Sequence, residues 1–221
     1  MPWVPIRGDP VQLNAGNFSN ANGYLPHMNA ADIESDAADR LLLERMAKGD
    51  RAALGALYHG YHGRLCRFLS RLTRRIDVIE EVTNDCFWIV WQKAGEFRGE
   101  SRVSTWIMGI AYRCGLKALR QHGAEAVEAG PESDEGTPAS HPDEDRELRD
   151  WLNKGLDRLS ADQRAVIELV YGVGHSLEEV AIIMQCPLGT VKARLFHARV
   201  KLRNVLPDLA GEAPVFRMRA S

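Results

Sequence analysis

Residues 123–146 contain almost no large apolar side chains, and this gap divides the sequence into two parts that must each form a core. Glycine, proline, serine and threonine mix there with acidic residues. The acids are Glu125, Glu128, Glu132, Asp134, Glu135, Asp143, Glu144 and Asp145. A segment of this composition buries too little apolar surface to offset the entropy lost on ordering, so we expect a flexible acidic linker. Two small domains joined in this way should have no fixed mutual orientation in the free chain.

Before the gap, apolar side chains recur at steps of three and four residues, which is the spacing of amphipathic helices. The pattern covers residues 39–122 and breaks at Gly49 and Asp50, a pair that can end one helix and cap the next. Asp77 and Glu80 are expected to act as a capping pair at the start of a later helix. This part of the chain is therefore predicted to be a bundle of helices.

After the gap, helical spacing resumes over residues 147–206, and neither part shows the two-residue alternation of a β-strand. We predict an all-α protein with two small helical domains, residues 39–122 and 147–206, joined by the acidic linker. Residues 1–38 contain several prolines, glycines and asparagines, and are expected to form a flexible N-terminal arm. Residues 207–221 are expected to be a frayed tail.

The composition argues against a membrane or secreted protein. No apolar stretch reaches the roughly 18 to 20 residues that cross a bilayer, and the first residues lack the basic and apolar regions of a secretory signal. The cysteines, Cys66, Cys86, Cys114 and Cys186, are widely separated and fall at apolar helix positions. Free thiols in a reducing compartment are the favoured interpretation. We therefore expect a cytoplasmic protein without direct membrane insertion.

No combination of residues points to catalysis, a metal or another cofactor. His62 and Cys66 could share one helix face as metal ligands, but no second ligand pair accompanies them. Gly172 and Gly174 enclose too short a segment to cradle a nucleotide phosphate. An enzyme that uses His or Cys chemistry is therefore the weaker alternative, and no catalytic residue is predicted.

The clearest local signals lie between Ser160 and Arg203. Two Ser-x-x-Gln/Glu sequences, which begin at Ser160 and Ser176, fit the capping box that starts a helix. The helix after Ser176 is interrupted at Pro187, because proline cannot continue it, and another helix begins near Leu188. Two helices joined by a turn of about three residues are typical of a helix-turn-helix, so the second domain is predicted to contain one.

The second helix of this pair is basic and has no acidic residue between Leu188 and Val205. Cations on both flanks of its apolar stripe could reach phosphates while small or polar residues face the base edges of a major groove. The predicted contacts with duplex DNA are Lys192, Arg194, His197, Arg199 and Arg203. A basic surface helix that ends an ordinary bundle would share the pattern, but the contrast with the acidic linker favours DNA binding.

The first domain carries an acidic helix face and, after it, a segment in which aromatic residues alternate with cations. The acidic face is either solvated or a docking surface for a basic partner. It comprises Asp77, Glu80, Glu81, Asn84 and Asp85, with Trp91 close behind, and all of these except Asp77 are the candidate docking residues. The second segment, residues 97–120, fits stacking and phosphate contact on single-stranded nucleic acid, although Trp106 equally suits a core position. The candidate contacts are Arg98, Arg102, Trp106, Arg113, Lys117 and Arg120.

Taken together, these segments resemble the extracytoplasmic-function (ECF) type of RNA polymerase sigma factor. Those similar to sigma region 2 are residues 47–58 (AKGDRAALGALY), 80–91 (EEVTNDCFWIVW), 97–99 (FRG) and 104–113 (STWIMGIAYR). Those similar to sigma region 4 are residues 159–164 (LSADQR), 176–181 (SLEEVA), 189–195 (GTVKARL) and 198–203 (ARVKLR). They occur in the family's order, on either side of a linker.

The resemblance implies a sigma factor that binds core RNA polymerase and directs transcription initiation at specific promoters in a stress or envelope response. The acidic face with Trp91 would dock on the clamp helices of the polymerase β′ subunit, and the β subunit would also be contacted. Residues 97–120 would recognise and melt the −10 element, with a loop that captures a flipped base. The helix from Leu188 would read the −35 element. An anti-sigma factor would clamp the two domains into a compact, inactive complex.

This sequence departs from the family pattern at three positions of the helix-turn-helix. Gln185 stands where glycine is frequent, and Ala193 and His197 stand where serine and arginine are common. The promoter sequence therefore cannot be predicted. The alternative function is that of a helix-turn-helix regulator that binds DNA without engaging polymerase. Its first domain should then carry a ligand pocket or a receiver instead of an acidic docking face.

Overall fold

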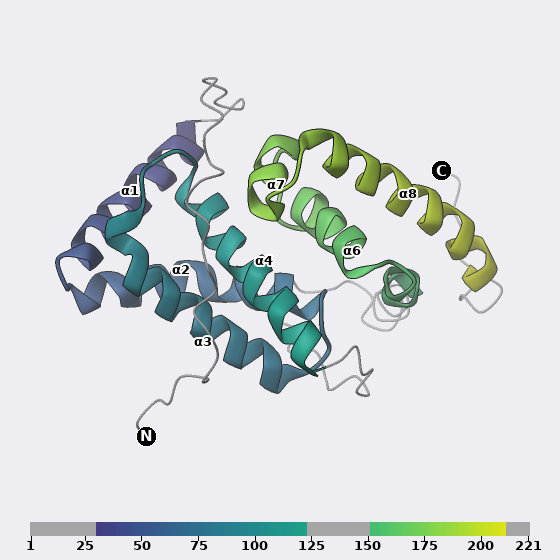
Figure 1. Cartoon of the computed structure of the whole chain (residues 1–221), viewed down its shortest axis with the longest axis horizontal. Helices are drawn as coiled ribbons and strands as arrows, with labels where there is room; N and C mark the ends of the chain where they lie inside the picture. The colour runs from purple at the N-terminus through teal and green to yellow at the C-terminus, as the bar shows by residue number, and fades with distance from the viewer. Residues whose placement is uncertain (1–29, 123–150, 211–221) are drawn as a thin grey trace, which may run out of the picture.

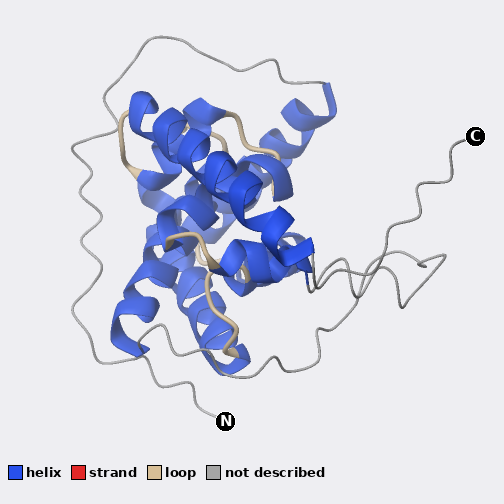
Figure 2. Cartoon of the chain, turned by 90° about the vertical axis from the view of Figure 1, so that its right-hand side faces the viewer, coloured by secondary structure: helices blue, strands red, loops and turns tan. Residues whose placement is uncertain are grey.

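The computed structural model describes residues 30–122 and 151–210, and within those ranges every regular element is a helix (Figure 2). The predicted all-α fold is confirmed. The whole predicted acidic linker, residues 123–146, lies outside the described residues, as do most of the N-terminal arm and most of the tail.

The first two helices, α1 (Ala30–Ala47) and α2 (Arg51–Ser70), meet at the predicted break. Gly49 has a φ of 87°, a left-handed conformation that glycine adopts without steric cost. Asp50 caps α2 by accepting hydrogen bonds from the backbone amides of Ala52 and Ala53, at 2.9 and 3.3 Å. However, α1 begins at Ala30, so residues 30–38 are helical where a flexible arm was predicted.

Two further helices complete the first bundle: α3 (Ile76–Lys93), followed by the short η2 (Ala94–Glu96), and α4 (Val103–His122). The prediction that Asp77 and Glu80 cap α3 is wrong. Arg75 is the N-cap residue, and Asp77 forms an ion pair with it at 2.6 Å. The core beneath these helices includes Phe68, Val90 and Ile107, which are all fully buried.

The second bundle contains a helix at residues 151–157, then α6 (Ala161–Ile167), the π-helical turn η3 (Glu168–Gly172), α7 (Leu177–Met184) and α8 (Leu188–Ala210). Both capping boxes predicted from the sequence, at Ser160 and Ser176, are present. Gln185 ends α7 with a left-handed φ of 51° and ψ of 47°. A glycine is therefore not required for the turn, although a glutamine there is strained.

The two bundles pack against each other, with α4 lying between α3 on one side and α6 and α7 on the other (Figure 1). Apolar residues of both bundles form one continuous buried cluster, in which Ile110 of α4 and Ile183 of α7 take part. The helices approach closely at Gly109, where a Cβ atom would lie in ordinary van der Waals contact, 3.8 Å, with the Cα of Ile183. The expectation that the domains have no fixed mutual orientation is wrong for this structure.

Candidate nucleic-acid interface

The predicted DNA-reading helix, α8, turns most of its cations toward solvent. Val191 and Ala198 are fully buried and anchor its inner face. The side chains of Lys192, His197, Arg199 and Arg203 are exposed on its outer face. The structure thus brings four of the five predicted duplex contacts together on one accessible, acid-free surface.

Arg194, the fifth predicted contact, is partly buried against the rest of the protein. Its Nη2 lies 2.5 Å from Oδ2 of Asp162 in α6, and its Nη1 lies 3.7 Å from the sulfur of Cys186. The other carboxylate oxygen of Asp162 accepts a hydrogen bond from the Tyr112 hydroxyl of α4, at 2.9 Å. Burial, together with the Asp162 carboxylate, raises the pKa of Tyr112. Arg194 therefore belongs to a network that joins the recognition helix to the first bundle.

Phe196 is a surface residue of α8 that was not among the predicted contacts. Its side chain is 63% exposed, and its ring packs edge to face on His197 with the centroids 5.5 Å apart. An exposed aromatic ring between cations is unusual for a solvated helix and suits contact with the methyl group of thymine. The helical spacing of the sequence could have predicted that Phe196 is exposed, since this residue lies opposite the core-facing apolar stripe.

The predicted single-strand contacts, which lie on α4 and on the segment before it, do not form one open surface. Arg98 and Arg120 are exposed, and Lys117 is partly exposed. Arg113 is largely buried, and this desolvation lowers its pKa. Trp106 is half-buried against Phe97, with the ring centroids 5.3 Å apart.

Arg102 is the predicted contact that the second bundle holds most directly. Its Nε lies 2.6 Å from Oε1 of Glu179 in α7, and the hydroxyl of Thr105 donates to the same oxygen at 2.9 Å. The second carboxylate oxygen of Glu179 accepts the backbone amide of Ser176 at 3.0 Å, as the capping box requires. One buried carboxylate therefore both starts α7 and joins it to the first turn of α4.

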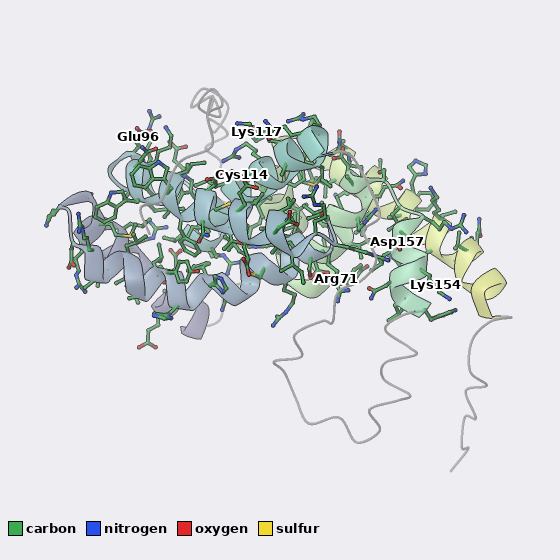
Figure 3. The ribbon with its side chains drawn as sticks, turned by 90° about the horizontal axis from the view of Figure 1, so that it is seen from below. Arg71, Glu96, Cys114, Lys117, Lys154 and Asp157 are labelled. Carbon is green, nitrogen blue, oxygen red and sulfur yellow. The ribbon has the colours of Figure 1, made fainter. Side chains whose placement is uncertain are left out.

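A second set of polar contacts joins α2 to the second bundle. Arg71 donates to Oδ1 of Asn153 at 2.7 Å, and its Nε lies 3.7 Å from the carboxylate of Glu168. Arg74 forms an ion pair with Asp157. Figure 3 shows Arg71 and Asp157 at this junction. Burial raises the pKa of Glu168, and the charge of Arg71 opposes that rise.

The predicted polymerase-binding face lies on α3. Glu80 and Asn84 are exposed, whereas Glu81, Asp85 and Trp91 are partly buried. Burial raises the pKa of Asp85, and the nearby charge of Glu81 raises it further. Trp91 packs against the core, while its neighbour Trp88 is 41% exposed. The face therefore presents acidic groups beside an accessible aromatic ring.

Two further observations concern metals and membranes. Among the described residues, no group of three or more His, Cys, Asp or Glu side chains is placed to hold a metal ion. The Cys66 sulfur does lie 3.6 Å from Nε2 of His62. Over residues 30–122 and 151–210, none of the helices has both the length and the apolar character needed to cross a membrane.

Comparison with known proteins gives a consistent assignment. Residues 57–125 match the family model described as Sigma-70 region 2, and residues 149–202 match Sigma-70, region 4. The chain is 32% identical over 189 residues to the ECF RNA polymerase sigma-E factor of Escherichia coli K12, which covers 80% of this chain and 98% of that protein. It is 29% identical over 191 residues to the RNA polymerase sigma-H factor of Pseudomonas aeruginosa PAO1, with 79% and 97% covered.

Two solved structures have a similar fold. The sigma factor RpoE of Bartonella quintana, in complex with the anti-sigma factor NepR, aligns with a TM-score of 0.56 at 27% identity, over 69% of this chain and 96% of that one. CnrH, in complex with the cytosolic domain of CnrY, aligns with a TM-score of 0.59 at 23% identity, over 77% and 98%. With a helix-turn-helix that exposes a basic recognition helix, and with relatives matched along nearly their whole length, this chain belongs to the ECF family of RNA polymerase sigma factors, which direct the polymerase to promoters.

Proposed function

We propose that this sigma factor reads the −35 element with α8 and the −10 element with residues 97–120. The observation that carries the first assignment is the exposed, acid-free surface formed by Lys192, His197, Arg199 and Arg203. Phe196 is added to this surface because of its exposure. The fit to a major groove, with cations positioned for phosphates around a central aromatic and imidazole pair, supports duplex recognition.

We infer that α3 docks the protein on core polymerase. The acidic face of Glu80, Glu81, Asn84 and Asp85, with Trp91 and the exposed Trp88 beside it, complements a basic, helical surface such as the β′ clamp helices. Sigma factors in general are not enzymes, and this chain is proposed to act without catalysis of its own, in the cytoplasm where the polymerase works.

The packed arrangement is proposed to be an inactive form, because it occupies part of the −10 surface. Arg102 is bound to Glu179, and Arg113 is largely buried. Promoter opening therefore requires α7 to leave α4. The surface of α8 is accessible in the same form, so the −35 element could be met before the bundles separate.

An anti-sigma factor is the proposed regulatory partner. Both similar solved structures are complexes, one of them named as a sigma factor with an anti-sigma factor. A partner that contacts both bundles would reinforce contacts that the chain already makes within itself. We also propose that the transcription directed by this sigma factor belongs to a stress or envelope response.

Run-off transcription with purified core polymerase over a genomic promoter library tests the sigma function directly. We expect transcripts that start downstream of a shared pair of −35 and −10 sequences. A chain that binds DNA but neither copurifies with core polymerase nor supports any transcript would instead be a helix-turn-helix regulator. Paired spin labels on α4 and α7 should report a short distance in the free protein and a longer one on the polymerase.

A further inference from the structure

Two residues of α1, Asp36 and Arg40, hold the loop before α4 in place. The sequence patterns placed Asp36 in the flexible N-terminal arm and Arg40 at the start of the first domain. Asp36 of α1 accepts a hydrogen bond from the backbone amide of Val103, the first residue of α4, at 2.7 Å. An aspartate from a distant helix therefore takes the part of an N-cap residue and satisfies an amide that has no partner within α4.

Arg40 lies one helical turn after Asp36 and reaches the same loop. Its Nε is 2.6 Å from Oδ2 of Asp36, and its Nη2 donates to the backbone carbonyl of Ser101 at 3.1 Å. Its guanidinium also lies over the Phe97 ring, 5.5 Å from the centroid. Together, Asp36 and Arg40 therefore contact the ring of Phe97, the carbonyl of Ser101 and the amide of Val103. These three groups span the segment 97–103.

Gly99 shows how closely the loop follows Arg40. It has a φ of 73°, and a Cβ atom built on it would come within 2.6 Å of Nη1 of Arg40. The loop conformation consequently depends on the absence of a side chain at this position and on the planar guanidinium beside it. Phe97 also links the loop to α4, because its ring packs on that of Trp106.

We propose that Asp36 and Arg40 are positioning residues for recognition of the −10 element: they hold residues 97–103 in the shape that accepts a base extruded from the duplex. The proposal rests on the assignment of this segment to the −10 element. The ion pair of Asp36 and Arg40 matters because it holds the Ser101 carbonyl, the Val103 amide and the Phe97 ring in a fixed arrangement. The side chains of Asp36 and Arg40 need not contact DNA themselves.

The experiment uses the full-length chain, core polymerase and a promoter that the run-off transcription experiment has identified. The variants are Asp36→Ala, Asp36→Asn, Arg40→Met and Arg40→Lys. Affinity of each holoenzyme is measured for the single-stranded non-template −10 oligonucleotide and for versions with each base of the element substituted in turn. Permanganate reactivity of unpaired thymines on the duplex promoter reports opening. Affinities for core polymerase and for a −35 duplex are measured in parallel.

We expect Asp36→Ala and Arg40→Met to lower discrimination at the captured base about tenfold, a factor equivalent to about 1.4 kcal/mol, and to reduce opening. Asp36→Asn retains an oxygen for the Val103 amide but loses the ion pair, so its effect should be intermediate. Arg40→Lys retains the charge but not the planar fork, and should rescue only in part. Core and −35 affinities should equal those of the wild type.

Asp50→Ala is the matched control. Asp50 also caps a helix and is also paired with an arginine of α1, at 2.8 Å from Arg45, and its hydrogen bonds and ion pair involve only Arg45, Ala52 and Ala53. It should lower stability by an amount similar to Asp36→Ala and leave base discrimination unchanged. An equal loss of discrimination in Asp50→Ala, or wild-type discrimination in both Asp36→Ala and Arg40→Met, overturns the proposal. A wild-type holoenzyme that does not bind the −10 oligonucleotide would instead refute the proposed function.

Discussion

Nε of Arg102 lies 2.6 Å from Oε1 of Glu179, and this ion pair joins the first turn of the second bundle's α7 to the segment that precedes α4. The Glu179 side chain is only 8% exposed and that of Arg102 is 21% exposed. A pair so shielded from water depends strongly on both partners, because removal of one leaves a buried charge without compensation.

Replacement Glu179→Gln should therefore separate the two bundles while it preserves α7. Glutamine can fill the third position of the capping box, so the helix start is retained, but Arg102 loses its counter-ion. We expect weakening of the packed form by about 3 kcal/mol. Small-angle scattering should show a larger radius of gyration, and paired spin labels on α4 and α7 a broader and longer distance distribution.

Glu178→Gln is the control for this change, since Glu178 lies in the same turn of α7 and has no hydrogen bond or ion pair with the rest of the described chain. It should leave the scattering profile unaltered. An unchanged radius of gyration in Glu179→Gln would show that apolar contacts alone hold the bundles together.

The same carboxylate predicts how stability varies with pH. Burial would raise the pKa of Glu179, but the nearby His175, the hydrogen bond from Arg102 and the Ser176 amide outweigh it and lower the pKa far below its usual value. A depressed folded pKa means that the contribution is fully present above the unfolded pKa of about 4.3 and is lost as the pH falls toward the folded pKa. Urea unfolding should show a wild-type advantage over Glu179→Gln that is present at pH 5 and shrinks below about pH 4. An advantage that is the same at pH 3 and pH 5 would contradict this.

The cations of α8 should differ in their effect on DNA binding according to their exposure. Lys192→Ala and Arg199→Ala are each expected to reduce the slope of log affinity against log salt by about 0.9, as one phosphate contact is lost, and to reduce −35-dependent transcription. Core binding should not change. Arg194→Ala should alter the slope less, because Asp162 already neutralises Arg194 in the packed form. The measurement is titration of a −35 duplex at several salt concentrations, and equal slopes for Arg194→Ala and Arg199→Ala would refute the distinction.

Reversal of charge on α3 should weaken polymerase docking. The double variant Glu81→Lys and Asp85→Lys places two cations opposite a basic partner surface, and we expect at least about a tenfold loss of affinity for core polymerase. The control is Glu34→Lys with Glu44→Lys, which makes the same charge change on the exposed side of α1. Pull-down of core polymerase by the α3 variant at the wild-type level would mean that the acidic face is merely solvated.

The helix-turn-helix was predictable in detail because its signals are local. A serine at the N-cap and a glutamine or glutamate three residues later satisfy amides within one turn, whatever surrounds them. The structure contains both boxes and starts α7 and α8 at Leu177 and Leu188. The assignment to sigma regions was equally accessible, since it depends on the order of short segments along the chain.

The helical residues 30–38 were missed for a physical reason. Their sequence, AADIESDAA, contains no apolar stripe, so the spacing that reveals an amphipathic helix is absent. What anchors this part of α1 is polar and distant: Asp36 binds Val103, and Asp39 accepts a hydrogen bond from the Tyr61 hydroxyl at 2.5 Å. No pattern within a short window could indicate those partners.

The order of residues along the chain was enough to establish most of the helices, the caps at Asp50, Ser160 and Ser176, the two bundles and the family, because each depends on neighbours a few positions apart. The packing of one bundle on the other depended on the folded chain, since Arg102 and Glu179 are 77 residues apart and the acidic stretch between them carries no sign of the contact. Such a contact forms when two finished surfaces match in shape and charge. That match arises from many residues at once, and it decides which of the predicted DNA contacts are accessible and which are covered.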